Sequence, residues 1–146
     1  AVLWGFCSLI SIIFYYDNFL GSGKAAWYLI NSFVMLLSAL ALSYLVGSIV
    51  KTSNALSGIV NILSLGMCFV CGVFVEMDLL SSGLKKAAQF LPVYWYETAN
   101  EILMDYGEIT GDVRNRLMSA IGIQMVFAAA FVCLTLATVK RSRRSS

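Results

Sequence analysis

Three long apolar runs constrain this chain more than any other feature of its sequence. They cover about residues 25–50, 55–75 and 113–139, and each is long enough to cross a bilayer as a helix, which takes roughly 20 residues. Of the 146 residues, 60% are hydrophobic and only 12% are charged. A water-soluble domain of this size cannot hide that much apolar surface. We therefore expect an all-α integral membrane protein.

A fourth apolar run, residues 1–16, comes first and is shorter than the others. It has no initiator methionine, no basic n-region and no small-residue cleavage site, so it does not read as a signal peptide. We expect this run to be the later part of a membrane helix that begins in sequence before Ala1. The chain then forms a single transmembrane domain of four transmembrane helices. The short connection at residues 51–54 makes the second and third helices antiparallel neighbours.

Residues 72–96 are too polar to span a bilayer and too aromatic for an ordinary solvated loop. Ser81 offers cap chemistry, and Pro92 cannot lie in a helix interior, so the pattern predicts two short helices at about 82–91 and 93–104. The first has an apolar side and a polar side. Tyr94 and Trp95 open the second, and such rings prefer the headgroup level. We expect an interfacial or re-entrant helix pair before the last transmembrane helix.

The third apolar run carries a stripe of small and polar side chains at steps of four, three, four and three residues. Its members are Ser57, Asn61, Ser64, Cys68 and Cys71. A polar group facing hydrocarbon is costly, so the stripe should face protein or water. Two interpretations remain open, helix packing and a substrate pathway.

Two other features of the apolar runs predict contacts between helices. Ala39, Ser43 and Gly47 repeat every four residues in the second run, which lets two helix backbones approach closely in lipid. Gln124 is the one strongly polar residue inside the last run, and we interpret it as an interhelical hydrogen-bond partner rather than a substrate ligand.

The charged residues indicate an orientation and exclude several functions. A basic cluster of Lys140, Arg141, Arg143 and Arg144 follows the last run, which is typical of a cytoplasmic end, although each side of the membrane carries five Lys or Arg residues. The chain has no His, and no acid lies inside a membrane run, so an intramembrane enzyme has no candidate catalytic or metal-binding residues. Nucleic-acid binding is not indicated.

The order of these segments resembles the permeases of type 2 ABC exporters. The residues that carry the resemblance are LSYLVGSIVKTSNA at a helix end and turn, GVFV at the end of the next helix, the short amphipathic helix, LPVYWY, and a last helix with a basic tail. The family usually has a Pro after the Gly and aromatic residue near Gly72–Glu76, and this chain lacks it.

The resemblance implies a six-helix permease of the plasma membrane, of which this chain is the C-terminal portion. It implies an ATPase partner that holds ATP, because the chain has no GxxxxGK[ST] loop and no cofactor of its own. It also implies pairing with a second permease copy, and a pathway along the Ser57 to Cys71 stripe. The outer gate or re-entrant helices would include Gly72, Phe74, Glu76, Pro92, Tyr94 and Trp95. The alternative is a non-transporting four-helix membrane protein, such as an immunity or assembly factor.

Overall fold

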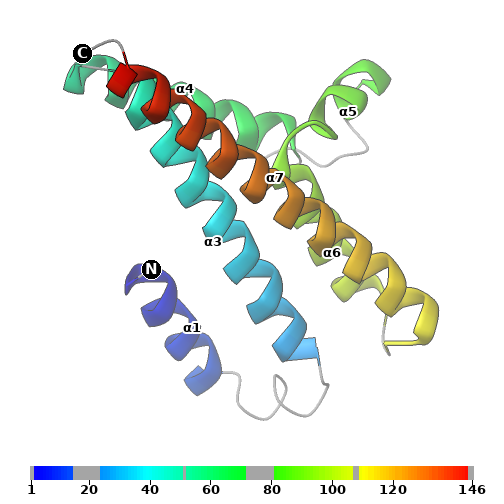
Figure 1. Ribbon diagram of the computed structural model, residues 1–146. Coiled ribbons are helices and arrows are strands. Elements are labelled where there is room, and N and C mark those ends of the chain that lie inside the picture. Colours follow the sequence, from blue (N-terminus) through cyan, green and yellow to red (C-terminus); the bar gives the residue numbers. More distant parts are fainter. Residues whose placement is uncertain (1, 15–23, 51, 72–80, 107–108, 145–146) are drawn as a thin grey trace.

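The computed structural model describes residues 2–14, 24–50, 52–71, 81–106 and 109–144, and its regular elements there are all helices. In chain order they are α1 (Val2–Phe14), α3 (Lys24–Ile49), α4 (Ser53–Val70), α5 (Ser82–Ala88), α6 (Pro92–Asp105) and α7 (Gly111–Arg144) (Figure 1). The prediction of an all-α membrane protein is confirmed.

Three of the described helices are long and apolar enough to cross a membrane: Lys24–Ile49, Ser53–Val70 and Gly111–Arg141. The described part of α1 has 13 residues, fewer than the roughly 20 that a span needs. It lies against α3, where Trp4 Nε1 donates a hydrogen bond to Ser32 Oγ at 3.0 Å and the Trp4 and Phe33 rings are 5.2 Å apart. The first predicted helix thus packs against the second.

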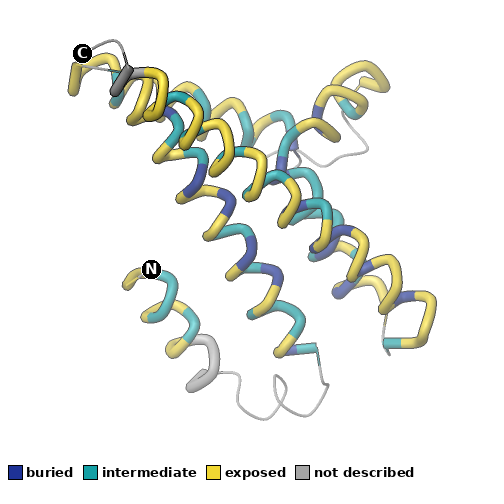
Figure 2. Tube along the Cα trace, viewed as in Figure 1, coloured by how far each residue is buried: buried dark blue, intermediate teal, exposed yellow. Residues whose placement is uncertain are grey.

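Helices α3, α6 and α7 form the packed core of the described chain. The buried residues of α3 lie along one side of that helix, toward α7 and α6 (Figure 2). A cluster of buried apolar side chains joins the three helices, and it consists of Val34, Ala99, Leu103, Leu117, Ala120 and Ile121. The alanines in this cluster are almost completely buried. Small side chains at these positions let α6 lie close to the two longer helices.

Helix α4 is attached much more loosely than α3 and α7, and none of its residues is buried. It runs antiparallel to α3, since Val46 and Val60 line one groove between the helices while Met35 and Met67 pack on one cluster nearer the other end. Its C-cap residue Cys71 is completely buried. The antiparallel arrangement expected from the short connection is therefore present, although the contact is limited.

The repeat of small residues at Ala39, Ser43 and Gly47 is not packed against another helix within the part of the chain that the structure describes. All three residues are exposed, and a Cβ built on Gly47 would meet no atom within 4 Å. The side of α3 that packs against α7 instead carries Val34, Ser38 and other buried residues. Ala39 and Ser43 line the groove between α3 and α4, so the described chain does not make the close approach that the repeat permits.

The two short helices begin at the residues that their sequences favour. Ser81 is the N-cap of α5, where its hydroxyl accepts a hydrogen bond from the Leu84 amide at 3.5 Å. Pro92 occupies the first turn of α6, where its missing N–H and fixed φ are tolerated.

Helix α5 ends at Ala88, earlier than predicted. The chain continues through a turn in which the Phe90 and Leu91 amides donate to the Ala87 and Ala88 carbonyls. Leu91 is extended, as expected for a residue that precedes proline.

Candidate functional site

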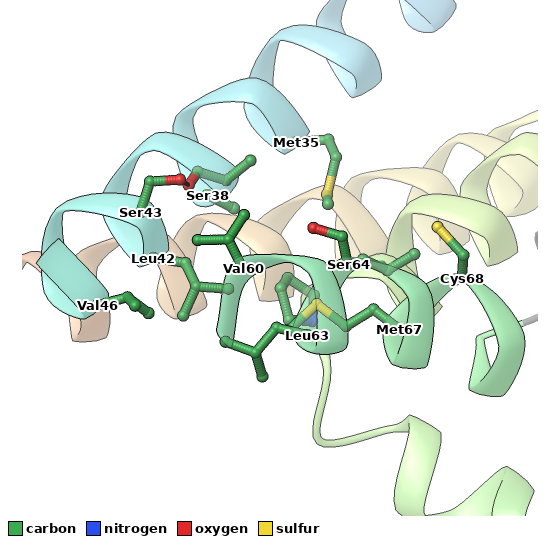
Figure 3. Close-up of a pocket in the computed structure, with 13 residues that line it drawn as sticks. Met35, Ser38, Leu42, Ser43, Val46, Val60, Leu63, Ser64, Met67 and Cys68 are labelled. Atoms are coloured by element: carbon green, nitrogen blue, oxygen red, sulfur yellow. Dashed lines mark hydrogen bonds between the residues drawn. The ribbon is translucent and has the colours of Figure 1, made fainter. Parts of the chain in front are cut away.

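A groove between α3 and α4 brings part of the predicted polar stripe to the surface of α3. Its cavity volume is about 200 Å³. Ser64 and Cys68 of α4 line it together with Ser38 and Ser43 of α3, and the remaining lining is formed largely by methionine, leucine and valine side chains (Figure 3). The groove is therefore mostly apolar. Serine residues line both walls, and the Cys68 thiol lies on the α4 wall.

The other stripe residues lie outside this groove. Ser57 and Asn61 are exposed on α4, whereas Cys71 is buried in a cluster with Ala88 and Val93. The stripe is divided because α4 presents to α3 the neighbouring side that carries Val60, Leu63 and Met67. The stripe lies at one edge of this contact, and most of its length is uncovered by the described part of the chain.

Three of the predicted gate residues, Pro92, Tyr94 and Trp95, are among the described residues. Pro92 is buried and lines the groove, so the start of α6 closes one end of it. The Tyr94 and Trp95 rings meet edge to face at 5.3 Å. Trp95 Nε1 donates to the Gln89 carbonyl at 2.9 Å, which connects α6 to the end of α5. Gly72, Phe74 and Glu76 lie outside the described residues.

A buried cluster of three amides, Asn31, Asn100 and Gln124, joins α3, α6 and α7. Asn31 Nδ2 donates to the Tyr96 carbonyl at 3.1 Å and to Asn100 Oδ1 at 2.9 Å, and Gln124 Nε2 donates to Asn31 Oδ1 at 2.8 Å. Asn31 and Gln124 are both completely buried. Gln124 Oε1 has no hydrogen-bond partner among the described residues. We call these three residues the amide cluster.

The sequence interpretation of Gln124 agrees with the structure in its role but does not identify its partner. Its assignment as an interhelical hydrogen-bond partner agrees with the structure, but its partner Asn31 was not identified. The signal was available, because Asn31 is a strongly polar residue within the otherwise apolar run at 25–50. Two amides in two apolar spans are candidates for pairing. Asn100 lies in a more polar helix, where nothing distinguishes it from a solvated residue.

Glu97 lies in the same turn of α6 as Asn100, outside the membrane-spanning helices. Partial burial raises the pKa of the Glu97 carboxyl above its ordinary value, a hydrogen bond with the Asn100 side chain opposes this, and the charge of Glu101 raises the pKa further. The carboxylate form is therefore disfavoured in the folded protein relative to the unfolded chain.

The raised pKa of Glu97 predicts a specific dependence of stability on pH. Folding should be favoured below the ordinary pKa of a glutamate and should weaken as the pH rises through the raised value. Glu97→Gln should abolish this loss and raise the melting temperature in detergent by a few degrees at neutral pH. Melting curves between pH 4 and pH 8 measure the effect. Glu101→Gln, at an exposed position, is the matched control and should change the profile less; an equal change in both variants would contradict this role of burial.

Comparison with known proteins gives a family for the chain. Neither the curated proteins nor the solved structures contained a significant match. The family model described as ABC-2 family transporter protein matches residues 1–137, and the apolar spanning helices agree with a multi-pass membrane protein. The chain therefore belongs to the ABC-2 transporter family, as a transmembrane component of an ABC transporter.

Proposed function

We propose that this chain is the permease subunit of an ATP-driven exporter, in which a separate ATPase subunit or domain hydrolyses ATP. The observation that carries the proposal is the family match over residues 1–137. In such a machine the permease alternates between two conformations, and ATP binding and hydrolysis by the partner shift the equilibrium between them. No residue of this chain has to perform covalent chemistry.

The exposed stripe of α4 supports a substrate pathway that this chain completes only with a partner. Asn61 and Ser64 are exposed in the described chain, and polar side chains facing hydrocarbon cost free energy. Protein or water must therefore cover this side in the assembled membrane protein. A second permease copy with a pathway between the two would supply both, and the groove beside Ser64 would widen that pathway toward α3.

The proposed location is the plasma membrane with a cytoplasmic C-terminus. Helix α7 continues past the apolar run, and Lys140 and Arg141 on this extension are exposed. A dense basic segment beyond a spanning helix is retained on the cytoplasmic side. The α5–α6 pair would then lie at the outer surface, next to the far end of the groove.

Affinity purification of the full-length protein in mild detergent tests the proposal. A nucleotide-binding ATPase should accompany the protein, and its ATP hydrolysis should respond to candidate substrates. Repeated absence of such a subunit, with the protein intact and folded, would leave the non-transporting alternative.

Leucine substitutions on the stripe test the pathway itself. Asn61→Leu and Ser64→Leu should each lower export several-fold while protein levels stay close to wild type, because both side chains are exposed on α4 and make few contacts within the chain. Export from reconstituted vesicles is compared with the amount of protein in the membrane. Ile62→Leu is the control, since Ile62 is 73% exposed and apolar. If protein level and export fall in step, the stripe serves packing only.

A further inference from the structure

The amide cluster forms three hydrogen bonds between α3, α6 and α7, and Ser38 Oγ also donates to the Gln124 carbonyl at 3.1 Å. The contacts around these bonds are largely apolar. Around the cluster α3, α6 and α7 meet through Val34, Ala99, Leu117 and their neighbours. Of the three amides, Asn31 is the one bonded to both of the other helices in the described chain, by two bonds to α6 and one to α7. Its side chain therefore links the position of α6 to that of both spanning helices.

The direction of the hydrogen bonds in the cluster is fixed by the main chain of α6. The Tyr96 carbonyl can only accept, so the amide group of Asn31 must turn its NH₂ toward α6. Its oxygen then faces Gln124, which must donate and leave its own oxygen, Oε1, unpartnered. Reorienting the amides cannot satisfy this atom, because Asn31 would then turn an oxygen toward a carbonyl.

The cluster is a poor stabiliser for so buried a network. A hydrogen bond between helices in a membrane contributes about 0.6 to 2 kcal/mol, and a buried polar atom without a partner costs about 1 to 3 kcal/mol. The gain from the Gln124 bond and the cost of Gln124 Oε1 therefore roughly cancel. Parting Gln124 from Asn31 costs less than parting a fully satisfied pair when opening admits water, because Gln124 Oε1 then gains a partner.

We propose that the amide cluster is a joint that opens during the transport cycle, and that Asn31, Asn100 and Gln124 are positioning residues that hold α6 against α3 and α7. The inference rests on the proposed function. Movement at the joint would reach α5 directly, because Trp95, next to Tyr96, is bonded to the Gln89 carbonyl at the end of that helix. The joint thus couples the spanning helices to the short helix pair.

A reversible cross-link that leaves the amides in place tests whether the joint opens. Tyr28→Cys and Tyr96→Cys place thiols on α3 and α6 at two half-buried positions whose side chains interact, in the full-length protein with its native cysteines replaced and its ATPase bound. A short bis-thiosulfonate reagent should lower export at least five-fold, and a reductant should restore it. Ser48→Cys with Thr138→Cys is the control, because these hydroxyls join α3 and α7 at 3.2 Å without involving α6.

Unchanged export after cross-linking, or a loss of export that the reductant does not reverse, would overturn the proposal that the amide cluster opens during transport. Absence of substrate-dependent export or ATPase response in the wild type would instead overturn the proposed function, so the two failures are distinguishable.

A second variant separates positioning from packing. Asn31→Leu with Gln124→Leu removes the two paired amides together, so no buried Gln124 atom is left without a partner. The Tyr96 carbonyl and Asn100 Oδ1 on the half-buried side of α6 still lose their donor. The melting temperature of the double variant should lie closer to the wild-type value than that of Asn31→Leu alone, while the ratio of substrate-stimulated to basal ATP hydrolysis falls at least two-fold. A wild-type ratio in this double variant would show that the cluster only packs the helices.

Discussion

Replacing Asn31 alone by leucine is expected to lower the free energy of unfolding by about 3 kcal/mol, because it leaves several groups without partners. Gln124 Nε2 loses its acceptor at a completely buried position, where Oε1 of the same side chain is already unpartnered. The Asn100 oxygen loses its donor from α3. Leucine has as many side-chain heavy atoms as asparagine but a larger volume, and it supplies no polar atom, so nothing offsets these losses.

Thermal unfolding of the purified protein in detergent, followed by circular dichroism, measures the effect of Asn31→Leu. Asn61→Leu is a matched control, because it makes the same substitution at an exposed position of another spanning helix. The control should melt within a few degrees of the wild type. If the melting temperature fell by the same amount in both variants, Asn31 would contribute no more to stability than an asparagine that lies outside the amide cluster.

The helices themselves could be predicted from the sequence because lipid leaves a chain few choices. A segment in hydrocarbon must satisfy its backbone groups internally, so an apolar run of sufficient length becomes a helix. Helix α3 begins and ends within one residue of the run at 25–50. The turn chemistry of Ser81 and Pro92 likewise places the short helices, since capping and proline effects act over a few residues.

The contacts between helices could not be predicted in the same way. Ala39, Ser43 and Gly47 have the spacing that permits close packing, yet α7 lies on the side of α3 that carries Asn31 and Ser38. Small residues allow an approach without requiring it, and the rotation of a helix depends on all its neighbours. A buried amide is a stronger constraint, because it must find a partner.

The stripe on α4 shows a different limit. Its polar character indicates that it needs cover, but a sequence pattern does not say whether that cover comes from the same chain, a partner or water. In the described chain Ser64 and Cys68 reach the groove beside α3, while Ser57 and Asn61 are left exposed. The pattern predicts which side of α4 needs cover, and the structure shows that α3 reaches the part of it around Ser64 and Cys68.

Enlarging Ala99 should have an effect as large as the loss of Asn31, by a different route. Ala99 is completely buried on α6 between α3 and α7, next to Asn100. A leucine there adds atoms to a filled core, which costs about 1 to 3 kcal/mol. It also pushes α6 outward, so the bonds from Asn31 to the Tyr96 carbonyl and to Asn100 lengthen or break. We expect a lower melting temperature together with loss of export.

Ala129→Leu on α7 is the matched control for Ala99→Leu, because Ala129 is exposed and its side chain can grow into lipid. It should retain the wild-type melting temperature, since Leu is at least as favourable as Ala in contact with hydrocarbon. Ala99→Gly, which creates space instead of removing it, should cost less than Ala99→Leu if overpacking is the cause. If the glycine variant were the less stable of the two, the damage would come from helix propensity or a void, and the close approach of α6 would not depend on the size of residue 99.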